Sequence, residues 1–111
     1  MNFKIRESEN VLVLALLEKA LDATVTIHFK RKMLELVHAG HHNIILNLAE
    51  VDFLDSSGVG AIMTIVKMLK SKGELVLCEL RSSQAMHLIL VTRMNKVLRI
   101  FETEEEALAS F

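Results

Sequence analysis

Hydrophobic and polar residues near the beginning of the chain follow a pattern that predicts two β-strands. The first strand is expected over Phe3–Arg6 and the second over Val11–Leu17, with the polar segment Glu7–Asn10 as a hairpin turn between them. The second run is apolar at nearly every position, which is typical of a strand buried on both faces. The chain is therefore expected to begin with a hairpin whose second strand lies inside a sheet.

Four later segments show helical signals. A first helix is expected to begin after Asp22 and to end at Gly40, and its apolar face contains Phe29, Met33, Leu36 and Val37. A second helix is expected to end at Gly73, with Val59, Ile62, Met63, Val66 and Leu69 on one stripe. A third is expected to begin at Ser82 or Ser83 and to bury Met86, Ile89 and Leu90. Thr103 and Glu106 have the spacing of a capping box that begins a fourth.

Short apolar runs between these helices predict three more strands. They cover Asn43–Leu48, Glu74–Leu80 and Val97–Phe101. Strands that alternate with helices indicate an α/β fold, with a mixed sheet of about five strands packed with about four helices through right-handed crossovers. With 111 residues, of which 51% are hydrophobic, residues 1–111 are expected to form a single domain around one core.

The charge and the cysteine content narrow the class of protein. Thirteen basic residues against fourteen acidic residues give a net charge of −1, so no overall positive field attracts nucleic acid or an anionic membrane. Lys67, Lys70 and Lys72 form a basic edge that is too short to indicate nucleic acid. No apolar run approaches the length of a membrane span. Cys78, the single cysteine, has no partner for an internal disulfide, so a reduced, cytoplasmic compartment is expected.

Other residues with reactive or metal-binding side chains favour ordinary structural roles. His38, His41 and His42 are close in sequence, but they are not accompanied by a cysteine or carboxylate at ligand spacing, so no metal site is expected. Cys78 lies in a predicted strand, where a lone thiol is usually a small core residue. No cofactor motif is present, and the chain lacks both a phosphate-binding lysine motif and an acid-base pair that would indicate an enzyme.

The segment Asp55-Ser56-Ser57-Gly58-Val59-Gly60 lies where a buried strand ends and a helix begins. Its two glycines are expected to allow a tight turn, and the free amides of the first helical turn favour an anion or a phosphoserine. It is not a P-loop, because no Gly-Lys-Ser/Thr follows, and it is not the Gly-x-Ser-x-Gly elbow of esterases. From the pattern alone, a simple helix cap by Asp55 is the more common interpretation, and Asp22 has the same one.

This segment, together with Asn47-Leu48 and Phe53-Leu54 before it, resembles the signature of STAS domains, most closely that of bacterial anti-sigma-factor antagonists. Four further segments match the family in order and spacing, and they extend the resemblance from the second strand to the C-terminus. They are Leu21-Asp22, Gly73-Glu74-Leu75-Val76-Leu77-Cys78, Met94 to Phe101, and Phe101-Glu102-Thr103-Glu104-Glu105-Glu106-Ala107-Leu108.

The resemblance implies a regulator that acts by exchanging partners. The serine after the aspartate, here Ser56, would be phosphorylated by an anti-sigma factor that is also a serine kinase with a histidine-kinase-like ATPase fold. The unmodified protein would bind that kinase and free the sigma factor, and a metal-dependent serine phosphatase would reverse the modification. Asp22 and Asp55 would flank the acceptor, with Ser57 beside it and Gly58 and Gly60 shaping its surroundings.

The family glycine three positions before Asp22 is replaced by Lys19, which introduces a cation near the expected phosphorylation site. A second interpretation of the same resemblance is a STAS subunit of a lipid-transport ATPase complex or of a stress-signalling scaffold, in which Ser56 is not phosphorylated. The oligomeric state stays open between a monomer and a weak dimer formed through the edge of the first strand.

Overall fold

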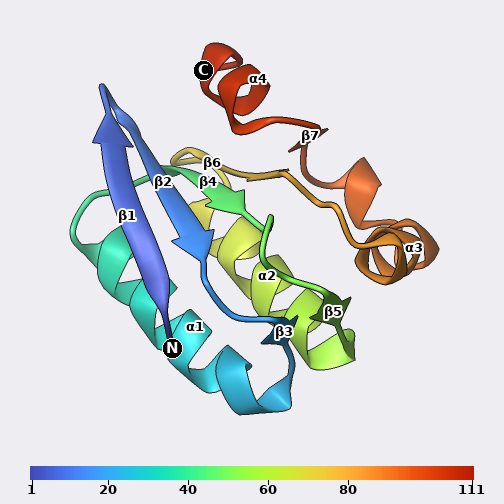
Figure 1. Cartoon of the computed structure of the whole chain (residues 1–111). Helices are drawn as coiled ribbons and strands as arrows, with labels where there is room; N and C mark the ends of the chain where they lie inside the picture. The colour runs from blue at the N-terminus through green and yellow to red at the C-terminus, as the bar shows by residue number, and fades with distance from the viewer.

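Two β-sheets and four α-helices make up the computed structural model, which describes residues 1–111 (Figure 1). In chain order the elements are β1 (Phe3–Ser8), β2 (Val11–Leu16), β3 (Ala20–Leu21), α1 (Ala23–His38), β4 (Asn43–Asn47), β5 (Phe53–Leu54), α2 (Ser56–Leu69), β6 (Glu74–Cys78), α3 (Ser83–Val91), the 3-10 helix η1 (Met94–Lys96), β7 (Ile100–Phe101) and α4 (Glu104–Ala109). The expected α/β class, with a mixed sheet of five strands and four helices, is confirmed.

The main sheet has the strand order β1-β2-β4-β6-β7. β1 and β2 form the predicted antiparallel hairpin, and all later neighbours are parallel. One row of paired residues crosses all five strands, from Ile5 through Leu14, Leu46 and Leu77 to Ile100. β2 has neighbours on both sides, as its apolar sequence predicts, whereas β1 is an edge strand.

Helices cover the two faces of this sheet unequally. α1 and α2 lie side by side on one face, and α4 lies on the other (Figure 1). Side chains alternate along β2, so that Leu12, Leu14 and Leu16 enter the larger core beneath α1 and α2, whereas Val11 and Val13 face α4. The parallel strands β2, β4 and β6 are therefore buried from both sides.

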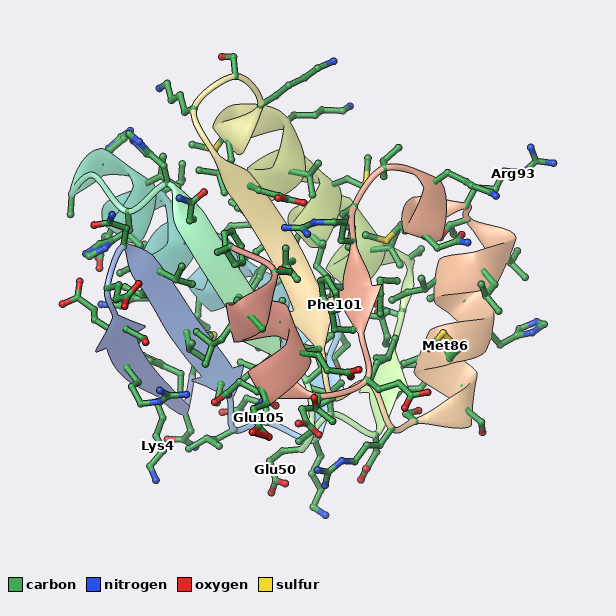
Figure 2. All side chains as sticks on the ribbon, turned by 90° about the horizontal axis from the view of Figure 1, so that it is seen from above. Lys4, Glu50, Met86, Arg93, Phe101 and Glu105 are labelled. Atoms are coloured by element: carbon green, nitrogen blue, oxygen red, sulfur yellow. The ribbon has the colours of Figure 1, made fainter.

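The short helix α4 is attached to the sheet by the buried Ala107, which packs in the smaller apolar cluster, and by polar contacts. Figure 2, seen from above, shows α4 lying across the strands, with Glu105 between Lys4 of β1 and Phe101 of β7. Glu104, the first residue of α4, accepts a hydrogen bond from the Asn47 side chain at 2.9 Å and pairs with Arg6. The predicted capping box of Thr103 and Glu106 is present in full. None of the four helices has the length and apolar character needed to cross a bilayer.

The end of α2 differs from the prediction. Gly40 follows α1 with a φ of +99°, as expected for a glycine at a helix C-terminus, but Gly73 has no such role. α2 ends at Leu69, and Ser71 takes the left-handed conformation with a φ of 75°. A Cβ at Gly73 would lie 2.0 Å from the carbonyl oxygen of His42. Close backbone approach at the start of β6 therefore explains this glycine.

Two predictions in the last third of the chain are wrong in part. α3 begins at Ser83 with Ser82 as its N-cap, but it buries only a narrow stripe, and Leu90 is 52% exposed. α3 lies at the side of the molecule (Figure 1), and only Ala85 and Ile89 of this helix are buried. The last strand is shorter than predicted, because η1 occupies the preceding segment and only Ile100–Phe101 pair with β6. Val97 lies in the turn between them and is 53% exposed.

Candidate functional site

A separate two-stranded parallel sheet supports the predicted site. β3 and β5 pair Ala20 with Phe53 and Leu21 with Leu54. The sequence did not reveal these strands, because two residues are too few to show a periodicity. Each strand is followed directly by an aspartate and a helix, so the parallel pairing brings the N-termini of α1 and α2 to the same end of the molecule (Figure 1).

Both aspartates are helix N-caps. Asp22 accepts from the Thr24 amide at 3.0 Å and from the Thr24 hydroxyl at 2.6 Å. Asp55 accepts from the Gly58 amide at 2.9 Å and from the Ser57 hydroxyl at 2.6 Å. These bonds satisfy amides that a helix leaves without partners in its first turn. The cap interpretation is therefore correct for both residues, and it leaves each carboxylate beside an exposed helix N-terminus.

The Asp55 carboxylate is stabilised in its ionised form. The hydrogen bond from the Ser57 hydroxyl, followed by the bond from the Gly58 amide, lowers the pKa of Asp55 below its ordinary value of 3.8. The backbone amide of Ala23, at the start of α1, acts in the same direction. The site therefore carries a fixed negative charge at neutral pH.

The two adjacent serines have different environments. Ser57 is half-buried, and its hydroxyl donates to Asp55. Ser56 is the first residue of α2 and is exposed, and its hydroxyl makes no hydrogen bond within the protein. Of the two hydroxyls, only that of Ser56 is both unengaged and accessible to another molecule.

The two glycines of the segment have roles other than the predicted tight turn. Both lie inside α2 with ordinary helical φ angles, so the turn expectation is wrong. A Cβ at Gly58 would lie 2.3 Å from the carbonyl oxygen of Leu21 and 2.7 Å from the Leu54 side chain. Gly58 therefore permits close packing of α2 on the β3–β5 sheet. Gly60 has open space around it and lies one turn beyond Ser56 on the exposed side of α2.

Lys19 acts on the site through its backbone. Its carbonyl oxygen accepts from the amides of Asp52 and Phe53 at 2.7 and 3.1 Å, and these bonds hold β5 against the segment before β3. Its side chain is 92% exposed, and the ammonium group lies 3.9 Å from the Asp52 carboxylate. Asp52 is its ion-pair partner, and Lys19 forms no such pair with Asp22 or Asp55.

Residues that were not predicted from the sequence also shape this end of the molecule. The Gln84 side chain of α3 bonds both backbone polar groups of Leu54, and the Ser82 hydroxyl donates to the Asp52 carbonyl at 2.7 Å. Phe53 and Ile27 add apolar surface, with 46% and 63% of their area exposed. Ser82 was recognisable as a cap, but nothing local in the sequence links Gln84 to a strand thirty residues away.

Comparison with known proteins agrees with this geometry. The family model described as "STAS domain" matches residues 2–107. The chain belongs to the STAS domain family. Its sequence is 27% identical over 104 residues to "Putative anti-sigma factor antagonist BtrV" of Bordetella bronchiseptica, a match that covers 90% of this chain and 86% of that protein.

Solved structures share the fold of this STAS domain. The crystal structure of an anti-sigma factor antagonist from Mycobacterium paratuberculosis superimposes with a TM-score of 0.89 at 16% identity, covering 98% of this chain and 92% of the other. The structure of the Bacillus cell fate determinant SpoIIAA in the phosphorylated form gives a TM-score of 0.74 at 23% identity and covers 98% of both chains. At these identities the likeness concerns the fold.

Proposed function

We propose that this STAS domain is an anti-sigma-factor antagonist controlled by phosphorylation of Ser56. In its unmodified form it binds an anti-sigma factor that is also a serine kinase with a histidine-kinase-like ATPase fold, and the sigma factor is thereby freed. Phosphorylation of Ser56 releases the complex, and a metal-dependent serine phosphatase restores the unmodified form. The domain acts as a substrate and a binding partner, while the kinase provides ATP, magnesium and the phosphoryl-transfer chemistry.

One observation carries the proposal. Ser56 combines an exposed, unengaged hydroxyl with a position at the first residue of a helix, while the neighbouring Ser57 is occupied by Asp55. A kinase therefore has one accessible acceptor in this pair. The names of the relatives support the same function, since BtrV is named an anti-sigma factor antagonist and SpoIIAA is described in a phosphorylated form.

The location of Ser56 is suited to a switch that changes binding without unfolding the domain. A phosphate adds about −1.5 to −2 charges, and the N-terminal end of α2 stabilises negative charge. The ionised Asp55 repels the phosphate. A unit negative charge about 5 Å from a carboxylate costs roughly 0.8 kcal/mol in water and about four times as much at an effective dielectric near 20. Repulsion therefore grows when a partner covers the site and excludes water.

The stronger repulsion between phosphate and Asp55 in the complex disfavours the bound state. A few kcal/mol of added repulsion, together with the poor fit of a phosphate at the contact surface, weakens binding on the order of 100-fold or more. Gly60 and the exposed Phe53 give the surroundings of Ser56 the low relief and apolar area that a partner surface needs.

The test is a capture experiment from extract of the cells that produce the protein. Ser56→Ala and Ser56→Asp variants serve as baits, with Ser83→Ala and Ser83→Asp as matched controls, since Ser83 is likewise the exposed first residue of a helix. We expect the Ser56→Ala bait to retain an ATPase kinase that the Ser56→Asp bait loses, with no difference between the Ser83 pair. Retention of the same transporter or scaffold proteins by both Ser56 baits would instead favour a STAS subunit without phosphorylation.

A further inference from the structure

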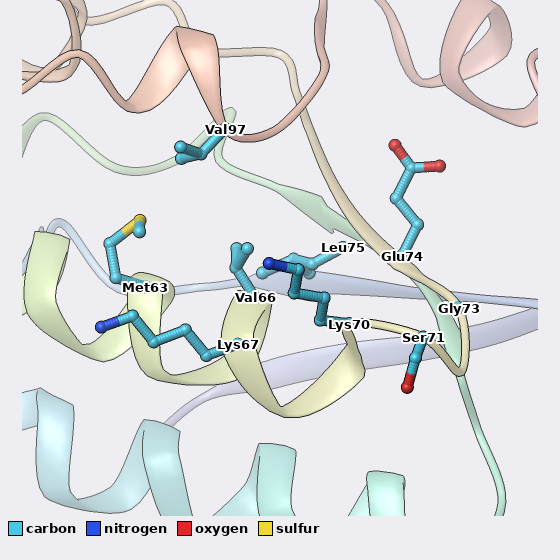
Figure 3. A pocket seen from close by; sticks show the side chains of 9 residues that line it. All are labelled: Met63, Val66, Lys67, Lys70, Ser71, Gly73, Glu74, Leu75 and Val97. Carbon is cyan, nitrogen blue, oxygen red and sulfur yellow. The ribbon is translucent and has the colours of Figure 1, made fainter.

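A hollow of about 420 Å³ lies along the C-terminal half of α2, whereas Ser56 is the first residue of that helix (Figure 3). It opens between α2, the start of β6 and the turn after η1. Its apolar surface comes from Met63 and Val66 of α2, Leu75 of β6 and Val97 of the turn. Its volume is within the range of sites for small ligands, about 300 to 1,000 Å³.

Two positive charges stand at this hollow without partners. Lys67 and Lys70 line it, and neither takes part in any ion pair of the structure. In Figure 3 the Lys70 side chain runs back over Val66, and the Lys67 side chain runs toward Met63. Lysines near a helix C-terminus often serve only to complement the helix dipole. Here both side chains run away from the C-terminal end of α2 and along the apolar lining (Figure 3).

The one carboxylate at the hollow is already neutralised. Glu74 receives two hydrogen bonds from Arg99, at 2.6 Å from Nε and 2.8 Å from Nη2, and these bonds raise the pKa of Arg99. The Arg99 guanidinium also lies 5.3 Å from the ring centre of Phe101 and 5.5 Å from that of Phe111, which fixes its position further. Glu74 is therefore not available to Lys67 or Lys70, and the net charge at the hollow is positive.

From this combination we infer that the hollow between α2, β6 and Val97 is a binding site for a small anionic amphiphile, a single-chain carboxylate with a medium-length apolar tail. The tail would contact Met63, Val66, Leu75 and Val97, and the carboxylate would lie between the two ammonium groups. The site is independent of Ser56, so its test and that of the proposed function succeed or fail separately.

The experiment is a titration of the isotopically labelled full chain with octanoate, followed by the amide and methyl chemical shifts. We expect saturable shifts confined to the lining residues, with much weaker binding of acetate, which lacks the tail, and of octanol, which lacks the charge. The Lys67→Gln/Lys70→Gln double variant is expected to weaken octanoate binding about tenfold, given two exposed charge contacts. Lys72→Gln, which alters a nearby lysine outside the lining, should leave it unchanged.

A second pair of variants tests the apolar wall. Val97→Asp should abolish octanoate binding, whereas Val91→Asp, at a comparably exposed position on α3 outside the hollow, should not affect it. Equal shifts with acetate, equal binding of octanol, or unchanged affinity in the double lysine variant would each overturn the inference. Shifts of the same residues on raising the protein concentration alone would also overturn it, because a second copy would then occupy the hollow.

Discussion

Gln84 of α3 bonds both backbone polar groups of Leu54, donating from Nε2 to the carbonyl oxygen at 2.7 Å and accepting at Oε1 from the amide at 2.9 Å. One side chain thus takes the place of a neighbouring strand beside β5. Leu54 is buried and directly precedes Asp55 and Ser56, so this contact fixes the backbone that leads into the proposed phosphorylation site.

We expect Gln84→Ala to lower the free energy of unfolding by about 1 to 2 kcal/mol, because it removes two hydrogen bonds and leaves a buried amide unpaired. Hydrogen exchange of the Leu54 amide should accelerate. Gln84→Glu keeps the acceptor for that amide but sets a carboxylate oxygen against the Leu54 carbonyl oxygen, so the Leu54 amide should stay protected although the domain is destabilised. Ser83→Ala is the matched control on the same turn of α3. Unchanged exchange at Leu54 in Gln84→Ala would mean that the contact does not hold β5.

Substitution by alanine at the two glycines of α2 should change the free energy of unfolding in opposite directions. Gly58→Ala places a methyl group 2.3 Å from the Leu21 carbonyl oxygen and should destabilise the domain by about 1 to 3 kcal/mol. Gly60→Ala meets open space and should stabilise it by about 0.5 to 1 kcal/mol through helix propensity. Urea unfolding of both variants measures this difference. A stable Gly58→Ala protein would contradict the packing of α2 against β3.

Asp55 should make the domain less stable in acid. The folded-state pKa of Asp55 is lowered, so its contribution is fully present above the ordinary value of 3.8 and is lost as the pH falls through the folded-state value. Asp55→Asn keeps a good N-cap without a titrating charge. The variant should have a lower free energy of unfolding than the parent at neutral pH, and urea unfolding should show a smaller difference at pH 3. A difference that is the same at both pH values would show that the charge of Asp55 does not contribute to stability.

Cys78 should be chemically silent in the folded protein. Burial, followed by the nearby charges of Glu104 and Glu79, raises the pKa of its thiol to about 12, so almost no thiolate exists at pH 8. Alkylation by iodoacetamide should therefore occur only through unfolding. The labelling rate should be higher in Gly58→Ala, because this variant unfolds more often. In denaturant, labelling should go to completion. Rapid labelling of the folded parent protein would place Cys78 at an accessible surface.

Local signals in the sequence predicted much of this fold. The hairpin follows from two strand-like runs separated by the polar segment Glu7–Asn10, and the α4 capping box follows from residues three positions apart, Thr103 and Glu106. The prediction that Leu90 is buried was wrong, because an apolar residue on a helical stripe does not show how wide the buried face is. The width of the buried face depends on the position of α3 at the side of the molecule.

For the candidate site, the sequence located Asp22, Asp55 and Ser56 but not what holds them. β3 and β5 are too short to leave a pattern, and the need for Gly58 arises from the carbonyl group of Leu21, far away in the chain. The same is true of Gln84 and Leu54. Such contacts exist only once the chain has folded, so composition and spacing do not reveal them.

The proposed function depends on control of partner binding by phosphorylation of Ser56. The most direct measurement compares the affinity of the captured ATPase kinase for three forms of the domain by calorimetry: unmodified, with phosphoserine incorporated at position 56, and with phosphoserine incorporated at position 83. We predict that phosphoserine at position 56 weakens binding on the order of 100-fold, while phosphoserine at position 83 leaves it within a few-fold of the unmodified form. Equal affinities of the unmodified form and the form phosphorylated at Ser56 would show that Ser56 does not control binding.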